Sequence, residues 1–291
     1  MFRVKGEFVD IVDIIRKASD LPSMPDVAFE VIRIADHAES SAMKVANTLS
    51  KDPSLSARVL RLANSAFYGM SREVSSVQES VVVLGMRTTK SLSLIAASFP
   101  WLHLALKGKG LKPELLWDHC ISCAHFSKLI AKKVDNMDAE QAFCVALLQD
   151  IGTVALYLTA ESEFIQLIEQ AKTSEVPFDE LERNLLEFDH AELGAALADS
   201  WNLPKIYSKA IKYHHRPSDQ EDPDLLTDII HVADILVRSR GITEGLDGAY
   251  YLKDEGAFER IGIEQEVLED LLSEALDRLN ESSQDSFANA A

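Results

Sequence analysis

Cysteine is scarce in this chain, and its scarcity limits the chemistry that thiols can supply. The 291 residues contain three cysteines, Cys120, Cys123 and Cys144. An odd number of cysteines in a chain of this length argues against a disulfide framework. Cys120 and Cys123 have the spacing of half a zinc site, but no second pair accompanies them and their segment is expected to be helical. Buried thiols are the preferred interpretation.

Aromatic residues are also few, at 7%, and no apolar run comes near the length of a membrane span, about 18–20 residues. The hydrophobic residues, 47% of the chain, recur at spacings of three and four more than they alternate. This pattern favours helices over sheets. Residues 1–7 have no signal-peptide core, so we expect a cytoplasmic protein that does not enter a membrane.

Positive charge is sparse in the second part of the chain. The formal net charge is -18, of which residues 1–112 carry +4 and residues 113–291 carry -22. An acidic excess of this size repels phosphate backbones. We therefore expect no direct binding of nucleic acid.

Glycine and proline gather at one candidate boundary. Residues 106–113 combine two glycines, three lysines and a proline, which is typical of a linker. We predict an N-terminal lobe of short helices over residues 1–105, a second helical lobe over 114–280 and a flexible tail over 281–291. The last helix of the first lobe is expected to begin at Met86 and end near Ser98. A groove between the lobes is the usual place for a ligand or partner.

Histidines are concentrated in the second lobe, which holds six of the eight: His119, His125, His190, His214, His215 and His231. Together with carboxylates they can form a site for iron, manganese or zinc, which imidazole and carboxylate ligands suit. They are spread over more than a hundred residues, so sequence spacing alone does not show that they converge.

Several of these positions also have a purely structural interpretation. His119 lies in an apolar helix and is explained equally well as a core histidine. Asp150 can cap the helix that follows it, and the residues around His190 have the spacing of a capping box.

Two further pairs have structural alternatives as well. Of the adjacent His214 and His215, only one is expected to face inward. His231 and Asp234 lie one helical turn apart and can bond to each other.

Six motifs resemble the bacterial HDOD domain family. They are LPSMP at 21–25, KDPSLSARVLRLANSAFYG at 51–69, SVVVLGM at 80–86, WDHC at 117–120, ALLQDIG at 146–152 and YHHRP at 213–217. The match spans about residues 11–240. It implies an all-α, HD-domain-like helical bundle related to HD-superfamily phosphohydrolases and used largely in signalling and regulation.

The resemblance also implies a metal-ligand set, since catalytic HD relatives bind one or two ions that activate water for phosphoester hydrolysis. Carried over by motif, the ligands are His119, Asp150, His190, His214, His215 and Asp234. The His-Asp pair of the family is here Gln149–Asp150, and an amide is a weak replacement for imidazole. Thr153 stands where cyclic-dinucleotide phosphodiesterases have lysine, and residues 216–218 replace their Gly-Tyr-Pro.

These departures favour a non-catalytic signalling or regulatory module that binds a protein partner or a small nucleotide-like ligand. No cofactor is certain, and iron, manganese or zinc held without turnover is compatible with this hypothesis. The alternative is a metal-dependent phosphohydrolase or phosphodiesterase with a glutamine-substituted ligand set, and a pure scaffold is a third interpretation. In the first lobe, Asn64, Ser65 and Tyr68 either contact a ligand or stabilise their own loop.

Overall fold

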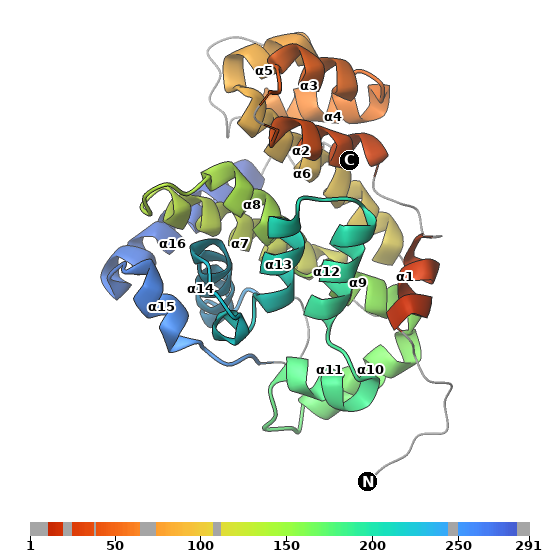
Figure 1. Ribbon diagram of the computed structural model, residues 1–291, viewed down its shortest axis with the longest axis vertical. Coiled ribbons are helices and arrows are strands. Elements are labelled where there is room, and N and C mark those ends of the chain that lie inside the picture. The colour runs from red at the N-terminus through yellow and green to blue at the C-terminus, as the bar shows by residue number, and fades with distance from the viewer. Residues whose placement is uncertain are drawn as a thin grey trace.

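The computed structural model describes residues 11–19, 25–37, 39–64, 74–106, 112–243 and 250–283. Within these ranges the chain forms helices and no strand, which confirms the predicted all-α fold (Figure 1).

The first lobe consists of four short helices and one long one. They are α2 (Asp26–Ala35), α3 (Ala42–Leu49), α4 (Pro53–Ala63), α5 (Val77–Leu84) and α6 (Met86–Leu106). Figure 1 shows α2–α5 gathered at one end of the molecule, with α6 leading from them toward the remaining helices. The expected N-terminal lobe of short helices is confirmed.

The second lobe is a bundle of longer helices. It contains α7 (Pro113–Ala131), α8 (Ala139–Leu148), α9 (Ile151–Thr159), α10 (Glu161–Ala171), α11 (Phe178–Leu186), α12 (His190–Ser200), α13 (Lys205–Tyr213), the 3₁₀ turn η2 (Pro217–Asp219), α14 (Leu225–Ser239), α15 (Glu255–Ile261) and α16 (Gln265–Ser283). The N-terminal helix α1 (Ile11–Ser19) packs against α9 and α12 of this lobe.

Local sequence signals set several helix ends in the first lobe. Asp52 accepts a hydrogen bond from the backbone N–H of Leu55 in the first turn of α4. Pro53 suits this turn because the N–H that proline lacks would have no partner within the helix. Ser76 caps α5 in the same way. Gly85 ends α5 with a φ of 85°, a conformation that favours glycine.

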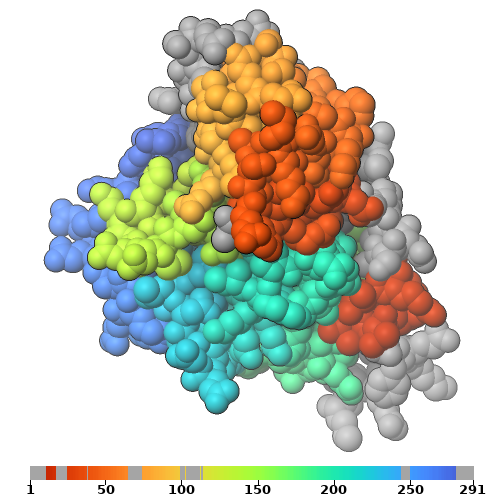
Figure 2. Space-filling view, turned by 45° about the horizontal axis from the view of Figure 1, so that its top comes forward, coloured from red at the N-terminus to blue at the C-terminus, as the bar shows by residue number. Residues whose placement is uncertain are grey.

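The two lobes are joined by buried contacts between distant parts of the sequence. The fully buried Lys90 on α6 lies 2.6 Å from Asp36 at the end of α2, and Tyr207 on α13 donates to the same carboxylate at 3.2 Å. Phe29 on α2 stacks on Trp201 at the end of α12, with ring centroids 4.7 Å apart. Figure 2 shows the first-lobe surface resting directly on that of the second lobe.

One prediction about apolar runs is wrong. Among the described residues, the stretch Ala139–Thr159 has the length and hydropathy of a membrane span. Within the fold, 89% of its most apolar window is buried, and the stretch forms α8 and α9. Helices that are apolar on all sides suit the buried interior of a large bundle, and α8 and α9 are buried in this way.

Other differences concern helix ends. α6 continues to Leu106, beyond the expected end near Ser98, and α16 reaches Ser283, three residues into the predicted tail. Residues 284–291, and most of the predicted boundary at 107–111, lie outside the described residues.

Candidate metal centre

The six histidines and aspartates that the family motifs select are brought together in the core of the second lobe. His119 lies on α7, Asp150 at the junction of α8 and α9, His190 at the start of α12, His214 and His215 at the end of α13, and Asp234 on α14. All six side chains are buried, with His215 the most exposed at 4%. They form the cluster that we call the metal centre.

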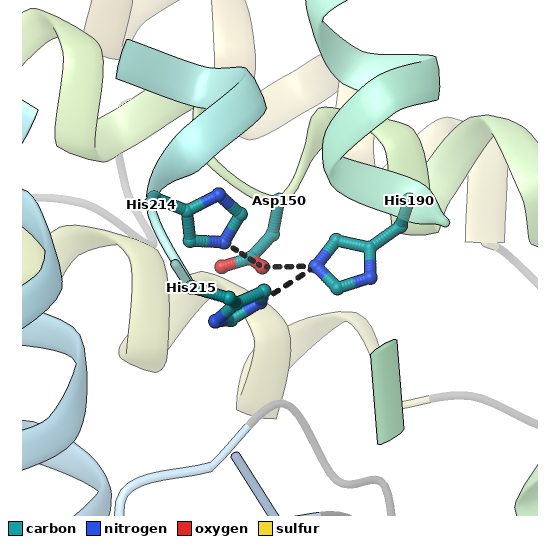
Figure 3. Close-up of side chains that lie close together, drawn as sticks. All are labelled: Asp150, His190, His214 and His215. Carbon is teal, nitrogen blue, oxygen red and sulfur yellow. Dashed lines mark hydrogen bonds and ion pairs between the residues drawn. The ribbon is translucent and has the colours of Figure 1, made fainter. Parts of the chain in front are cut away.

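Four of these side chains point their ligand atoms at one spot. Suitable atoms of Asp150, His190, His214 and His215 all lie within 4.8 Å of one another. Figure 3 shows the three imidazole rings arranged around the Asp150 carboxylate. His190 Nε2 and His214 Nε2 lie 3.7 and 3.8 Å from Asp150 Oδ1, and His190 Nε2 lies 2.9 Å from His215 Nε2.

The Nδ1 atoms of two rings are held by backbone carbonyls, which fixes the tautomer of each ring. Nδ1 of His119 lies 3.0 Å from the Ile242 carbonyl, and Nδ1 of His214 lies 2.7 Å from the Ile211 carbonyl. Because a carbonyl only accepts, Nδ1 must carry the proton in both rings. The Nε2 atoms that face the centre are therefore left with a lone pair.

His190 is oriented by a carboxylate, whereas a second carboxylate lies beside His215 without a hydrogen bond to it. Glu182 Oε2 accepts from both Nδ1 and the backbone N–H of His190, at 2.6 and 3.1 Å. Asp234 Oδ2 lies 3.5 Å from His215 Nδ1. A carboxylate behind an imidazole is the usual support of a metal-binding histidine, because it orients the ring and makes its free nitrogen more basic.

The other half of the metal centre contains His119, Cys123 and Asp234, whose ligand atoms also lie within 4.8 Å of one another, and Gln149 hydrogen-bonds into it. Its amide nitrogen donates to Asp150 Oδ2 at 3.1 Å and to Asp234 Oδ1 at 3.2 Å, and lies 3.4 Å from His119 Nε2. The reverse orientation of the amide would set its oxygen against two carboxylates. Arg238 Nε donates to Asp234 Oδ1 as well, at 2.8 Å.

Buried atoms that lack a hydrogen-bond partner mark where an ion fits. They include Asp150 Oδ1 and His214 Nε2, both of which face the spot shared with His190 and His215. Leaving such atoms unpaired in the core costs about 1–3 kcal/mol each, which a coordinated cation would offset. Two nitrogens bound to one ion at about 2.1 Å and a right angle lie about 3 Å apart, close to the His190–His215 spacing. A single ion therefore fits these four residues.

Burial and neighbouring carboxylates together set the pKa values of the histidines in the metal centre. Burial lowers the pKa of His214 and, more strongly, that of His215, so both rings stay neutral. Burial also opposes charge on His190, but Glu182 and Asp150 outweigh it and raise its pKa to about 10. Positive charge is favoured at the spot between these two carboxylates, whether a proton or a metal ion carries it.

The close contact of α9 with α12 places Asp150 beside His190. Gly152 is the second residue of α9, and a Cβ atom there would come within 1.9 Å of the His190 carbonyl oxygen and 2.7 Å of the Gly194 nitrogen. Only glycine permits this approach. The ALLQDIG motif therefore supplies the candidate ligand Asp150 and also Gly152, whose lack of a side chain lets α9 approach His190.

The structure decides several of the alternatives that the sequence left open. Asp150 stands at the cap position of α9, yet its side chain makes no capping hydrogen bond. Asp189 caps α12 as expected, accepting from Glu192 at 2.7 Å, while the His190 ring is free to face the metal centre. The expectation that only one of His214 and His215 faces inward is wrong, because the chain bends after α13 and both rings are buried in the cluster.

Other candidate residues have structural roles. His231 does not bond to Asp234; its Nδ1 lies 2.8 Å from the His214 carbonyl, and its Nε2 accepts from the Asp254 backbone at 2.9 Å. Asn64 bonds to both backbone groups of Val74, at 2.7 and 2.9 Å, so it ties its own loop together. Ser65 and Tyr68 lie outside the described residues.

Sequence reasoning missed four neighbours of the metal centre: Cys123, Glu182, Arg238 and Tyr251. All three cysteines are free and buried, as predicted, and Cys123 Sγ lies 3.6 Å from His119 Nε2. Tyr251 stacks on His215 with ring centroids 3.8 Å apart. Of these, Glu182 has a weak sequence signal, since it lies one helix before His190 in a segment rich in acids.

The sequence comparisons agree with the geometry. Histidines and aspartates converge here from four helices and one helix junction of an all-helical fold, as the family motifs implied. The family model for the HDOD domain matches residues 21–217, so the chain belongs to the HDOD domain family.

Individual relatives are distant and of different lengths. An uncharacterized protein of Treponema pallidum (strain Nichols) is 25% identical over 224 residues; these cover 76% of this chain but only 43% of that protein. An HDOD domain protein of unknown function from Geobacter sulfurreducens superposes with a TM-score of 0.70 at 24% identity, covering 94% of this chain and 89% of its own. A Shewanella amazonensis SB2B protein, provisionally assigned as a phosphohydrolase, superposes with a TM-score of 0.70 at 25% identity. The superposition covers 92% of this chain and 95% of that protein.

Replacing Glu182 with glutamine tests its support of His190. The amide can still occupy the space but no longer carries charge, so we expect the affinity for Mn²⁺ to fall about 10–100-fold. Isothermal titration of the apo-protein measures the change. Glu180→Gln, a half-buried acid in the same turn of α11 that pairs with Arg216 and not with His190, is the matched control, and an equal loss in both variants would contradict the assigned role.

Proposed function

We propose that this chain is a cytoplasmic regulatory module that holds one divalent metal ion at Asp150, His190, His214 and His215, and that it does not hydrolyse phosphoesters. Iron, manganese and zinc suit this mixed ligand set. The ion, when bound, supplies Lewis acidity and fixed positive charge in a buried place. The module would respond to a signalling protein or a small ligand.

The observation that carries this proposal is the position of the Gln149 amide. Its N–H groups bridge Asp150 Oδ2 and Asp234 Oδ1 beside His119 Nε2. These are the atoms that would hold a second ion in the ligand set implied by the family. A neutral donor there takes the place of a cation between two carboxylates, so that His119, Cys123 and Asp234, which also lie within 4.8 Å of one another, would hold no second ion.

The surroundings of the metal centre also favour a regulatory role. A cavity of about 270 Å³ reaches His215 and is lined by Arg183, Lys212 and Arg216. Both guanidinium groups are already paired, Arg183 with Asp179 and Asp189 and Arg216 with Asp179 and Glu180. Lys212 lies 4.0 Å from Glu192 as well, so every cation that the structure places in this lining has an acidic partner, and little positive charge is left there for a phosphate group.

A phosphohydrolase is the second candidate, because this same cavity gives one route from solvent to His215 and a relative at 25% identity is provisionally assigned that activity. Assays of the Mn²⁺-loaded protein with p-nitrophenyl phosphate, a phosphomonoester, and bis(p-nitrophenyl) phosphate, a phosphodiester, distinguish the two functions. We expect no turnover above that of Asp150→Ala. Turnover by the wild-type chain that Asp150→Ala lacks would establish the second candidate.

Replacing Gln149 with histidine should open the second half of the metal centre. An imidazole at this position removes the amide bridge and adds a ligand beside His119 and Asp234. We expect the Mn²⁺ content to rise from one to two ions per chain, measured by elemental analysis after gel filtration. Gln141→His, on the helix that precedes Gln149 and outside the metal centre, should leave the content at one. A content that stays at one in Gln149→His would contradict the role given to the amide.

A further inference from the structure

A second cavity lies at the junction of the two lobes, away from the metal centre. It measures about 410 Å³, within the range of small-molecule sites. Its walls come from α5 and α6 of the first lobe and α7, α8 and α16 of the second, which meet on one side of the molecule in Figure 1. We call it the interlobe cleft.

The interlobe cleft is cationic although the chain as a whole is strongly acidic. Lys128, Lys132 and Arg278 line it, against a single lining acid, Glu140. Lys128 pairs with Glu140, and Arg278 pairs with the exposed Glu274. Lys132 makes no ion pair within 4.0 Å among the described residues, so its charge is available to a ligand.

Crowding of like charges is visible in the pKa values around the interlobe cleft. Burial lowers the pKa of Lys132, and Lys128 and Arg278 lower it further. His125, which also lines the cleft, has its pKa lowered to about 3, first by burial and then by Lys128. A bound anion would relieve this repulsion.

The remaining lining is apolar. Val83, Leu84, Leu129 and Ala275 contribute carbon surface, and Val83 is 41% exposed at the edge of the cavity. A bare inorganic ion would leave this surface in contact with water. The cleft therefore suits a molecule with a compact charged group at one end and an apolar part at the other.

We propose that the interlobe cleft binds a small organic anion of the phosphomonoester type, with its dianionic head among Lys128, Lys132 and Arg278 and its apolar part against Val83 and Leu129. The inference rests on the proposed regulatory function, for which it names a ligand class, and it does not require the metal ion. A ligand here touches both lobes. Its affinity therefore depends on how the lobes are arranged, and it can favour one arrangement over another.

The interlobe cleft also shares helices with the metal centre. Lys128 lies on α7, which carries His119, and Lys132 directly follows this helix. Glu140 lies in the first turn of α8, which ends next to Gln149 and Asp150. Glu140 is held from the first lobe as well, since Ser91 on α6 donates to it at 2.5 Å. An anion that competes for Lys128 would disturb a group that links α6 to α8.

The test uses phenyl phosphate as the probe on the full chain, titrated calorimetrically after EDTA treatment so that no metal ion can hold the phosphate. We expect one binding site per chain, and weaker binding of inorganic phosphate and of phenylacetate, which lack the apolar part and the second charge respectively. Absence of phenyl phosphate binding, or equal affinity for inorganic phosphate, would overturn the proposal.

Matched variants locate the site. Lys132→Glu should weaken phenyl phosphate binding at least about tenfold, whereas Lys133→Glu, exposed in the same turn but outside the lining, should not. Likewise Val83→Glu should weaken it and Val82→Glu should not. Equal effects within either pair would place the anion elsewhere. The Mn²⁺ content of each variant is measured alongside. If the protein binds phenyl phosphate but no Mn²⁺, the proposed metal site fails. If it binds Mn²⁺ but no phenyl phosphate, the proposed ligand of the interlobe cleft fails.

Discussion

Replacing His190 with alanine is expected to abolish stoichiometric metal binding. The substitution removes one of four ligands and also leaves Glu182, which is fully buried, without its imidazole partner. Loss of a supporting carboxylate alone typically lowers affinity about 10–100-fold, so loss of the ligand itself should exceed about 100-fold. Titration of the apo-protein with Mn²⁺, followed by calorimetry, measures this.

The matched control is His119→Ala. Its ring belongs to the half of the metal centre that contains Gln149: His119 Nε2 lies 3.0 Å from Asp234 Oδ1 and 3.5 Å from Asp150 Oδ2, the carboxylate oxygen that does not face the shared spot. We expect this variant to keep one ion with an affinity within a few-fold of the wild type. Circular dichroism confirms that both variants fold. If His119→Ala weakens binding as much as His190→Ala, the metal centre is not divided as described.

The second large effect is expected from Gly152→Ala. The added methyl group would lie 1.9 Å from the His190 carbonyl oxygen, so α9 and α12 must separate. Overpacking of this kind costs about 1–3 kcal/mol and sometimes more, and two rigid helices leave little room to relax. We expect a loss of about 3 kcal/mol or more in the free energy of unfolding by urea, together with weaker Mn²⁺ binding because Asp150 moves away from His190.

Gly194→Ala is the control for this substitution. Its Cβ would approach the Ile211 side chain at 3.0 Å and the Gly152 nitrogen at 3.3 Å, contacts that small shifts can accommodate. The loss of stability should therefore be smaller than for Gly152→Ala. A Gly152→Ala protein within about 1 kcal/mol of the wild type would show that the contact between α9 and α12 is not needed to build the metal centre.

Much of the fold follows from short-range signals. The caps at Asp52, Ser76 and Asp189 and the stop at Gly85 act within one helical turn, so the residues that decide them are adjacent in the sequence. The apolar stretch of α8 and α9 could not be interpreted in this way. Its burial depends on helices contributed by distant segments, and its length and hydropathy alone also fit a membrane span.

The candidate site was predictable in composition but not in arrangement. Family motifs selected the six residues, and the structure brings them together. The roles within the cluster depend on which atom meets which. No spacing in the sequence shows that Glu182 lies behind His190, that Gln149 bridges two carboxylates, or that the bend after α13 turns both His214 and His215 inward.

The central claim is that one ion binds on the histidine side of the cluster while an amide closes the other side. A crystal structure of the Mn²⁺-loaded protein, with anomalous-difference data collected near the manganese edge, tests it most directly. We predict one peak, bonded to Asp150, His190, His214 and His215. A second peak between His119 and Asp234, or no peak among the three histidines, would contradict this account.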